Sequence, residues 1–430
     1  MGQRSCARGP CCVFAGVLLS AVTVLAQSAD WPQWGGPHRN FKSDAKGLAE
    51  SWPPAGPRRL WSRDLGEGYS SIAAVSGMLY TMYRIGDQEV VIALHAASGK
   101  TVWEHAYDAP FIVAGREADI VEEYHLENGL GPHSTPLIVG NYLFAAGATG
   151  WFHCLDKNTG KIVWKHQLIT ELDGFVRQRG YGPSPIAYKN TVILPVGAAG
   201  GSFMAFDQED GKIVWQRHDY HHAYASPSLI NVDGQDQLVT FMRDWLVGVD
   251  PNNGDLFWSY RVESQGTNVS TPVWGPGNLL FMSAAYGVGT RVLRLTRSAG
   301  KTSVEEVWVS PRVRLHFANA IRIGDVVYGS SGDFGPAFFT AIDVNTGKII
   351  WRDRRLARAS FIYADGRFII LDEDGRLVLA TPSAEGLTIH SQVELLQSNA
   401  WTLPTLVGKT LYVRDRKTML ALDVGSAGHQ

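Results

Sequence analysis

Cysteine is almost absent from this sequence. Of its 430 residues only four are cysteines, and three of these, Cys6, Cys11 and Cys12, lie close to the N-terminus. Without that segment only Cys154 remains, so no internal disulfide is possible. Cys154 occupies the small-residue position of a repeated phrase described below, and we expect it to be a buried, unreactive thiol.

The chain also lacks an excess of charge of either sign. It has 39 Lys and Arg residues against 41 Asp and Glu residues, a formal net charge of −2, and no basic cluster. Because nucleic-acid binding requires a basic surface, we expect no nucleic-acid partner. Beyond the N-terminal segment there is no apolar run of about 18 residues, so no further transmembrane span is predicted.

The first 26 residues have the pattern of a secretory signal peptide. Arg4 and Arg8 precede the apolar run CCVFAGVLLSAVTVLA, and small residues up to Ala26 offer a cleavage site. A retained membrane anchor is the alternative interpretation. We therefore expect a secreted or periplasmic protein with a signal peptide over residues 1–26.

One phrase recurs along the rest of the chain: a small residue, an apolar residue, Asp, a short turn ending in Gly, and then Trp. Its copies occupy residues 93–103, 154–164, 205–215, 248–258 and 341–351, with His95 replacing Asp in the first. Such self-similarity indicates a repeat architecture. The Trp always follows the small residue by ten positions, so we expect the indole ring to pack over it.

The glycine of each phrase is predicted to lie in a hairpin bulge with positive φ, a conformation that glycine reaches at low cost. Burial of each indole would contribute roughly 4–6 kcal/mol before entropy costs. A degenerate copy at residues 294–308 adds Trp308, and an N-terminal strand at residues 58–66 adds Trp61. The tryptophans predicted to have this structural docking role are therefore Trp61, Trp103, Trp164, Trp215, Trp258, Trp308 and Trp351.

A second motif precedes each phrase: a small or Pro-containing step, an apolar strand, a Gly turn and another apolar strand. Four short strands per unit of roughly 40–50 residues are typical of a β-propeller. The sequence therefore predicts an all-β, eight-bladed propeller of four-stranded antiparallel blades. The eight copies of the motif start at Tyr69, His133, Gly182, Ala225, Val269, Ala318, Ala359 and Ala400.

Both ends of the repeat region are incomplete. Residues 58–66 read as a Trp strand with nothing before it, and the final ALDVGSAGHQ stops before its Trp strand. We expect the N-terminal strand to complete the last blade, which closes the ring and removes exposed sheet edges. The single propeller would then span residues 58–430, and residues 27–57 would form an irregular strap over one face.

The repeats resemble the tryptophan-docking motif of the pyrroloquinoline-quinone (PQQ) propeller superfamily, Ala-x-Asp-x-x-Thr-Gly-x-x-x-Trp. Residues 154–164 and 341–351 match it closely, and the resemblance extends from about Trp31 to the C-terminus. It implies the fold but leaves the function open, because one fold hosts unrelated activities. In this superfamily, quinoprotein dehydrogenases hold PQQ and Ca²⁺ over the propeller axis, whereas other members bind protein partners.

Polar and aromatic residues gather in the loops that lead into the innermost strands, which surround the mouth of a propeller channel. Several blades would thus direct hydrogen-bonding groups at one place, as a ligand site requires. The alternative is that these side chains tie loops together or line a water-filled funnel. The candidates are His133, Tyr181, His222, Tyr224, Asn268, His316, Asn319, Arg358 and Asn399, with Trp401 beside them.

No metal site is assigned. Asp219, His221 and His222 are neighbours in the sequence, but adjacent residues of a strand point to opposite faces. A Ca²⁺ ion would need several oxygen ligands, and no spacing assigns them. The available side chains are Glu122, Glu123, Asn268 and Asp333.

Two longer loops interrupt the repeat, at residues 108–131 and 169–180. The first is predicted to contain a short helix with Glu122, Glu123 and His125. Long loops often cover functional sites, although a solvated acidic helix face is the alternative interpretation.

Two functions stay open at this point. The preferred interpretation is a monomeric, non-catalytic binding or scaffold module of the cell envelope, with a protein partner or a small-molecule ligand at the propeller face and no assured cofactor. The alternative is a dehydrogenase that uses PQQ and Ca²⁺ to oxidise a small alcohol or sugar. The resemblance implies a vicinal disulfide and extra loops for such an enzyme, and this chain has one cysteine beyond its leader.

Overall fold

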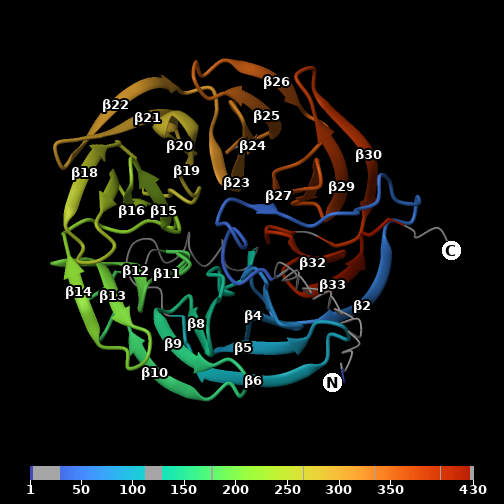
Figure 1. Cartoon of the computed structure of the whole chain (residues 1–430), viewed down its shortest axis with the longest axis horizontal. Coiled ribbons are helices and arrows are strands. Elements are labelled where there is room, and N and C mark those ends of the chain that lie inside the picture. Colours follow the sequence, from blue (N-terminus) through green and yellow to red (C-terminus); the bar gives the residue numbers. More distant parts are fainter. Residues whose placement is uncertain are drawn as a thin grey trace.

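The computed structural model of the chain describes residues 1–2, 30–111, 128–175, 178–264, 266–333, 335–397 and 399–426. Eight sheets stand side by side in a closed ring, with almost no helix (Figure 1). This confirms the predicted eight-bladed propeller. The predicted signal peptide and the predicted helix around Glu122, Glu123 and His125 lie outside the described residues.

The blades are antiparallel meanders in which consecutive strands are hydrogen-bonded neighbours. The first four blades are β3 (Ala73–Val75), β4 (Met78–Ile85), β5 (Gln88–His95), β6 (Thr101–Asp108); β7 (Leu137–Val139), β8 (Tyr142–Ala146), β9 (Trp151–Asp156), β10 (Ile162–Gln167); β11 (Ile186–Tyr188), β12 (Thr191–Ala198), β13 (Gly201–Asp207), β14 (Ile213–Arg217); and β15 (Ser228–Val232), β16 (Gln235–Phe241), β17 (Trp245–Val249), β18 (Leu256–Arg261).

The remaining blades follow the same order, and a short 3₁₀ helix, η1 (Pro276–Asn278), joins the first two strands of the fifth. They are β19 (Val273–Gly275), β20 (Leu279–Ala284), β21 (Gly289–Ser298), β22 (Lys301–Ser310); β23 (Leu315–Ile323), β24 (Val326–Ser331), β25 (Phe338–Asp343), β26 (Ile349–Asp353); β27 (Ala359–Ala364), β28 (Arg367–Asp372), β29 (Arg376–Pro382), β30 (Leu387–Glu394); and β31 (Thr405–Val407), β32 (Thr410–Arg414), β33 (Thr418–Asp423), β2 (Arg58–Asp64).

The eighth blade joins the two ends of the chain, as predicted. Its outer strand β2 pairs antiparallel with β33, and Trp61 lies opposite Ala421. That pair repeats the relation between the small residue and the Trp in the other blades, such as Ala93 opposite Trp103. The Arg58 Nη2 atom donates to Asp423 Oδ2 at 2.8 Å across the same strand pair. The closing blade is therefore a regular copy of the repeat assembled from two distant segments.

Residues 30–57 cross one face of the ring. Trp31 forms a bridge to Ala74 of the first blade, and the Pro32 carbonyl accepts a hydrogen bond of 2.9 Å from Ile138 N in the second. Figure 1 shows this segment in blue, running between the rim and the centre of the ring. Its β1 (Lys42–Ser43) pairs in parallel with β27, so the seventh blade has five strands where four were expected.

The core consists of apolar side chains between neighbouring blades. Every residue of the middle strand β12 is buried, whereas the outer strand β30 alternates between exposed and more buried positions. This gradient follows from stacking sheets around an axis, because inner strands are covered on both faces and outer strands face water on one side. Among the described residues, no helix has the length and apolar character that crossing a membrane requires.

The repeated tryptophans lie against two different partners. Within its blade, Trp164 stands opposite the small residue Cys154, and a bulge follows that pair. Its indole Nε1 then donates to Gln208 O of the next blade at 3.1 Å. The same ring covers Gly211 of that blade, where an added Cβ would lie 2.5 Å from the indole. The glycine thus provides both the turn conformation, with φ of +74°, and a flat surface for the neighbouring indole.

Trp103 repeats this arrangement, because its Nε1 donates to Lys157 O at 2.9 Å and its ring covers Gly160. Trp258 departs from it. Its Nε1 donates to Gln237 Oε1 of its own blade at 2.7 Å, since the fifth blade, which follows, carries an irregular copy of the phrase. These contacts support the predicted docking role of the tryptophans, and its energetic weight is open to direct measurement.

Two glycines of the third blade separate the cost of the turn from the cost of displacing the indole. Gly200 has φ of +66° with nothing within 4 Å of an added Cβ, whereas Gly211 lies beneath Trp164. We expect Gly200→Ala to destabilise the protein by about 1–2 kcal/mol and Gly211→Ala by about 1–3 kcal/mol more. Urea unfolding of both variants measures the difference. Equal losses would show that the indole contact contributes nothing.

Candidate functional site

A cavity of about 650 Å³ opens on the axis of the ring, on the face formed by two kinds of loops. One kind leads into the first strand of each blade, and the other joins the second and third strands. In an antiparallel four-stranded blade both lie on the same face, because the chain reverses at every turn. On the opposite face the first and second strands are joined, and there Asp365 holds the strap through Gly47 N at 2.9 Å.

The structure places six of the nine predicted residues, and also Trp401, in the wall of this cavity. His316 and Asn319 both lie on β23, and the other four come from loops that are far apart in the sequence. Their role in ligand binding stays a prediction. The six are His133, Tyr224, His316, Asn319, Arg358 and Asn399.

The other three, Tyr181, His222 and Asn268, lie outside the cavity wall and are buried. The Tyr181 hydroxyl donates to Pro195 O at 3.0 Å, and Asn268 Nδ2 donates to Met242 O at 2.8 Å. The His222 ring bonds the carbonyls of Ala223 and Phe175. These side chains tie loops to the blades, which was the alternative interpretation for the whole set.

Asn319 combines both roles. Its amide lies in the cavity wall, yet its Nδ2 donates to Phe361 O at 2.8 Å and its Oδ1 accepts from Phe361 N at 3.1 Å. Both polar atoms are therefore already engaged by the next blade. Asn319 holds two blades together and is a weak candidate for contact with a ligand.

Aromatic rings form a continuous part of the wall. Tyr69 is stacked on His133, with ring centroids 5.5 Å apart and planes 8° apart. Its other neighbour is Trp401 at 4.9 Å, and Trp401 in turn lies 5.0 Å from Phe317. Offset contacts of this kind hold aromatic side chains rigidly. The wall therefore offers a preformed apolar surface to a ligand.

A local irregularity turns two residues of β23 toward the cavity. Leu315 pairs with Ser331, and the next regular pair is Ala320 with Gly329, so the intervening residues leave the ladder. Bulges of this kind redirect side chains near functional sites. Here they place His316 and Phe317 in the cavity wall.

His316 faces Tyr286, whose hydroxyl lies 3.0 Å from its Nε2 atom. Burial, together with the nearby positive charges of Arg179 and Arg358, lowers the pKa of His316 to about 4. At neutral pH the imidazole is therefore uncharged and can accept a hydrogen bond from the Tyr286 hydroxyl.

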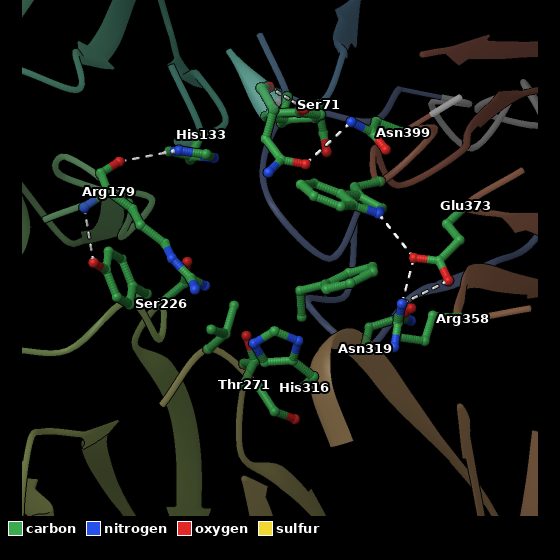
Figure 2. Close-up of a pocket in the computed structure, with 18 of the residues that line it drawn as sticks. Ser71, His133, Arg179, Ser226, Thr271, His316, Asn319, Arg358, Glu373 and Asn399 are labelled. Carbon is green, nitrogen blue, oxygen red and sulfur yellow. Dashed lines mark hydrogen bonds and ion pairs between the residues drawn. The ribbon is translucent and has the colours of Figure 1, made fainter. Parts of the chain in front are cut away.

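Two carboxylates of the wall, those of Glu373 and Asp333, are paired with arginines, whereas Asp374 is exposed. Glu373 forms a two-point pair with Arg358, with Nε–Oε2 and Nη2–Oε1 distances of 3.0 Å, and it also accepts from Trp401 Nε1 at 3.2 Å. Asp333 is paired with Arg314 at 3.1 Å. Figure 2 shows the Arg358–Glu373 pair on one side of the cavity and the Arg179 side chain reaching in from the other.

The sequence analysis missed several lining residues. Tyr286 and Glu373 lie in loops between second and third strands, whereas only the loops leading into first strands were considered. Trp34 lies in the strap, and its Nε1 donates to Thr271 Oγ1 at 3.0 Å at the base of the cavity. The acidic turn that contains Glu373, DEDG, was a signal available in the sequence.

Comparison with known families agrees with this geometry. A family profile described as "Outer membrane protein assembly factor BamB" matches residues 89–353, which is more than half of the chain. The chain belongs to this family. The predicted membership of the PQQ-like propeller superfamily is thereby confirmed.

Curated relatives fall into two groups. The outer membrane protein assembly factor BamB of Yersinia pestis is 22% identical over 303 residues, covering 67% of this chain and 73% of the relative. The 1-butanol dehydrogenase (cytochrome c) of Thauera butanivorans is 22% identical over 280 residues, covering 60% of this chain and 38% of the enzyme. Sequence similarity thus reaches both functional classes.

Solved structures show the same division. BamB from Moraxella catarrhalis superposes with a TM-score of 0.59 at 18% identity, covering 85% of this chain and 99% of that one. The quinohemoprotein alcohol dehydrogenase from Comamonas testosteroni gives 0.63 at 14% identity, covering 94% and 81%. At these identities the likeness shows the fold alone.

The described side chains of the wall do not match the ligand requirements of Ca²⁺. Within the part of the chain that the structure describes, no group of three or more His, Cys, Asp or Glu side chains could hold a metal ion. The wall contains the half-buried carboxylate of Glu373 and the buried carboxylate of Asp333. Glu373 is already paired with Arg358, and Asp333 is already paired with Arg314. A Ca²⁺ ion usually binds about 6–8 oxygen atoms, and the two arginine-paired carboxylates of the wall do not provide that number.

The lowered pKa of His316 predicts a loss of stability in acid. Between pH of about 6.5 and about 4 the unfolded chain binds a proton at this residue and the folded protein does not, so stability falls as the pH drops. The loss approaches about 1.4 kcal/mol per pH unit and about 3 kcal/mol in total. Above pH 6.5, roughly, the residue contributes no pH dependence.

We expect His316→Gln, which keeps an acceptor for the Tyr286 hydroxyl, to reduce the slope of stability against pH. The reduction should approach about 1.4 kcal/mol per pH unit, which corresponds to the uptake of one proton on unfolding. Urea unfolding at a series of pH values between 4 and 7, about the range of the shift, measures it. His390→Gln, a change at an exposed position on β30, serves as the control. An unchanged slope in His316→Gln would contradict the assignment of a neutral, buried imidazole.

Proposed function

We propose that this protein is a non-catalytic binding or scaffold module of the cell envelope, located in the periplasm or outside the cell, which uses the loop face of the propeller to hold its ligand or partner. The family supports this proposal, because the curated relatives with the larger shared length are outer membrane protein assembly factors. The shape of the cavity agrees, since it is concave, largely preformed and lined by aromatic and polar groups.

The ion pairs of the wall carry the proposal. A general base must be close to its substrate and free to accept a proton, and a metal ligand must have oxygen lone pairs to offer. Both oxygens of Glu373 accept hydrogen bonds, from Arg358 and Trp401. Asp333 Oδ2 accepts from Tyr286 N at 3.1 Å and is paired with Arg314. These carboxylates organise the wall, and this favours binding over chemistry.

The alternative is a quinoprotein dehydrogenase. It is favoured by the position of the cavity on the propeller axis and by the match to alcohol dehydrogenases among the relatives. The sequence matches to those enzymes extend over less than half of their lengths, 38% and 37%. If PQQ were bound, Arg179 and Arg358 are the lining residues whose charge suits its carboxylates.

Calorimetric titration of the purified protein with PQQ in the presence of Ca²⁺ separates the two functions. We expect no stoichiometric binding at high micromolar PQQ and no reduction of an electron-accepting dye when ethanol, 1-butanol or glucose is added. A quinoprotein dehydrogenase reconstituted in parallel is the positive control. Tight binding together with dye reduction would replace our proposal by the dehydrogenase.

A further inference from the structure

We propose that the central cavity binds the end of a neutral oligosaccharide, held between the aromatic wall and the hydrogen-bonding groups that face it. This inference rests on the proposed binding function and names the class of ligand. The volume of about 650 Å³ lies within the roughly 300–1,000 Å³ of small-molecule sites, and it leaves room for a short chain of sugar rings.

The aromatic wall fits one side of such a ligand. Trp401 and Phe317 are half-buried and stand in line with Tyr69, at centroid distances of 5.0 and 4.9 Å from Trp401. The face of an aromatic ring carries negative partial charge, which attracts the polarised C–H groups on the face of a sugar ring. Tyr69 is 6% exposed and supports Trp401 from behind, so Trp401 and Phe317 provide the ring surface that a sugar can contact.

The polar groups of the wall fit the hydroxyl groups of a sugar. A hydroxyl both donates and accepts, so it is best met by donors and acceptors side by side. Such neighbours occur in the Arg358–Glu373 pair at 3.0 Å and in the Tyr286–His316 pair at 3.0 Å. A further pair joins Asn399 Nδ2 to Asn128 Oδ1 at 3.2 Å. All of these residues line the cavity.

The charges of the wall favour a neutral ligand. The wall contains Arg179 and Arg358 together with the carboxylates of Asp333, Glu373 and Asp374, and Arg314 also pairs with Asp333, so neither sign dominates. A multiply charged anion would lie beside three carboxylates as well as beside the arginines. A cation would meet the arginines whose field helps to lower the pKa of His316. Because burying an unpaired charge is costly, a polar but uncharged ligand suits this wall best.

The strap limits how the ligand enters. Trp34 lies at the base of the cavity and is fixed by Thr271, and the strap crosses the face of the ring beneath it. Access is therefore from the loop face. A chain that enters a site from one face presents its end, and this is why we infer recognition of a terminal segment.

Binding is tested on an array of neutral, uronic-acid-containing and amino-sugar oligosaccharides, followed by calorimetry with the neutral glycans that respond. We expect one or more neutral oligosaccharides to bind with a stoichiometry of one, and more tightly than their uronic-acid or amino-sugar counterparts. No binding to neutral glycans, or tighter binding of a charged series, would overturn the inference.

Variants then place the ligand in the cavity. Trp401→Ala should weaken binding about tenfold or more, whereas Trp401→Phe, which keeps a ring face and is the safer variant for folding, should weaken it less. Trp245→Ala is the matched control, because Trp245 is also half-buried but packs against Tyr220 outside the cavity. Equal affinity in Trp401→Ala and the wild type would exclude this cavity as the site.

The dye-reduction assay keeps the two proposals separate. If neutral glycans do not bind and no dye is reduced, the ligand class is wrong while the non-catalytic function stands. If a neutral glycan binds and is oxidised in the presence of PQQ and Ca²⁺, the ligand class stands and the non-catalytic function fails. Binding without oxidation supports both.

Discussion

The contact between a repeated indole and the glycine turn of the next blade, made by Trp61, Trp103, Trp164, Trp215 and Trp308, is the recurrent link between the sheets of the ring. Trp164 has a small residue opposite it in its own blade and Gly211 beneath it in the next, so a single side chain fixes the spacing of two sheets. The hydrogen bond from its Nε1 to Gln208 O adds direction to an otherwise apolar contact. Where it recurs around the axis, this contact fixes the spacing of neighbouring blades, and the loops that form the cavity wall extend from those blades.

The fold could be predicted from the sequence because its determinants are local and repeated. The distance of ten residues from Ala93 to Trp103 is the length of one hairpin, and the register of β5 and β6 places these residues opposite each other. Closure was predictable for the same reason, since an unfinished phrase at one end of the chain and an unpaired Trp strand at the other can only complete each other. The parallel pairing of β1 with β27 was not predictable, because the strap carries no repeat and its position depends on contacts with distant blades.

The cavity was only partly predictable. The positions of the loops in the sequence correctly identified His133 and Trp401 as lining residues. They could not show which side chains turn away from the cavity and into the blade, as Tyr181 does when its hydroxyl bonds the Pro195 carbonyl. Nor did it include the turns between second and third strands, which supply Glu373 and Tyr286. Because the chain reverses at every turn, both kinds of loops lie on the same face. Each blade can therefore contribute residues to the cavity wall from two loops, which are separated in the sequence by its first two strands. The irregular pairing of β23 that turns Phe317 into the cavity has no signature in the sequence.

Closure of the ring and the shape of the cavity are coupled through Arg414. This side chain, on β32 of the closing blade, is fully buried, and its guanidinium donates to Gly68 O at 3.0 Å and to Ser70 O at 3.3 Å. These two carbonyls flank Tyr69 in the aromatic wall. Burial lowers the pKa of Arg414 to about 10, so the group stays charged at neutral pH and the carbonyls replace its water. Because Arg414 of the closing blade holds the carbonyls on both sides of Tyr69, we expect a ligand stacked beside Trp401 to bind the closed ring most tightly and therefore to stabilise it.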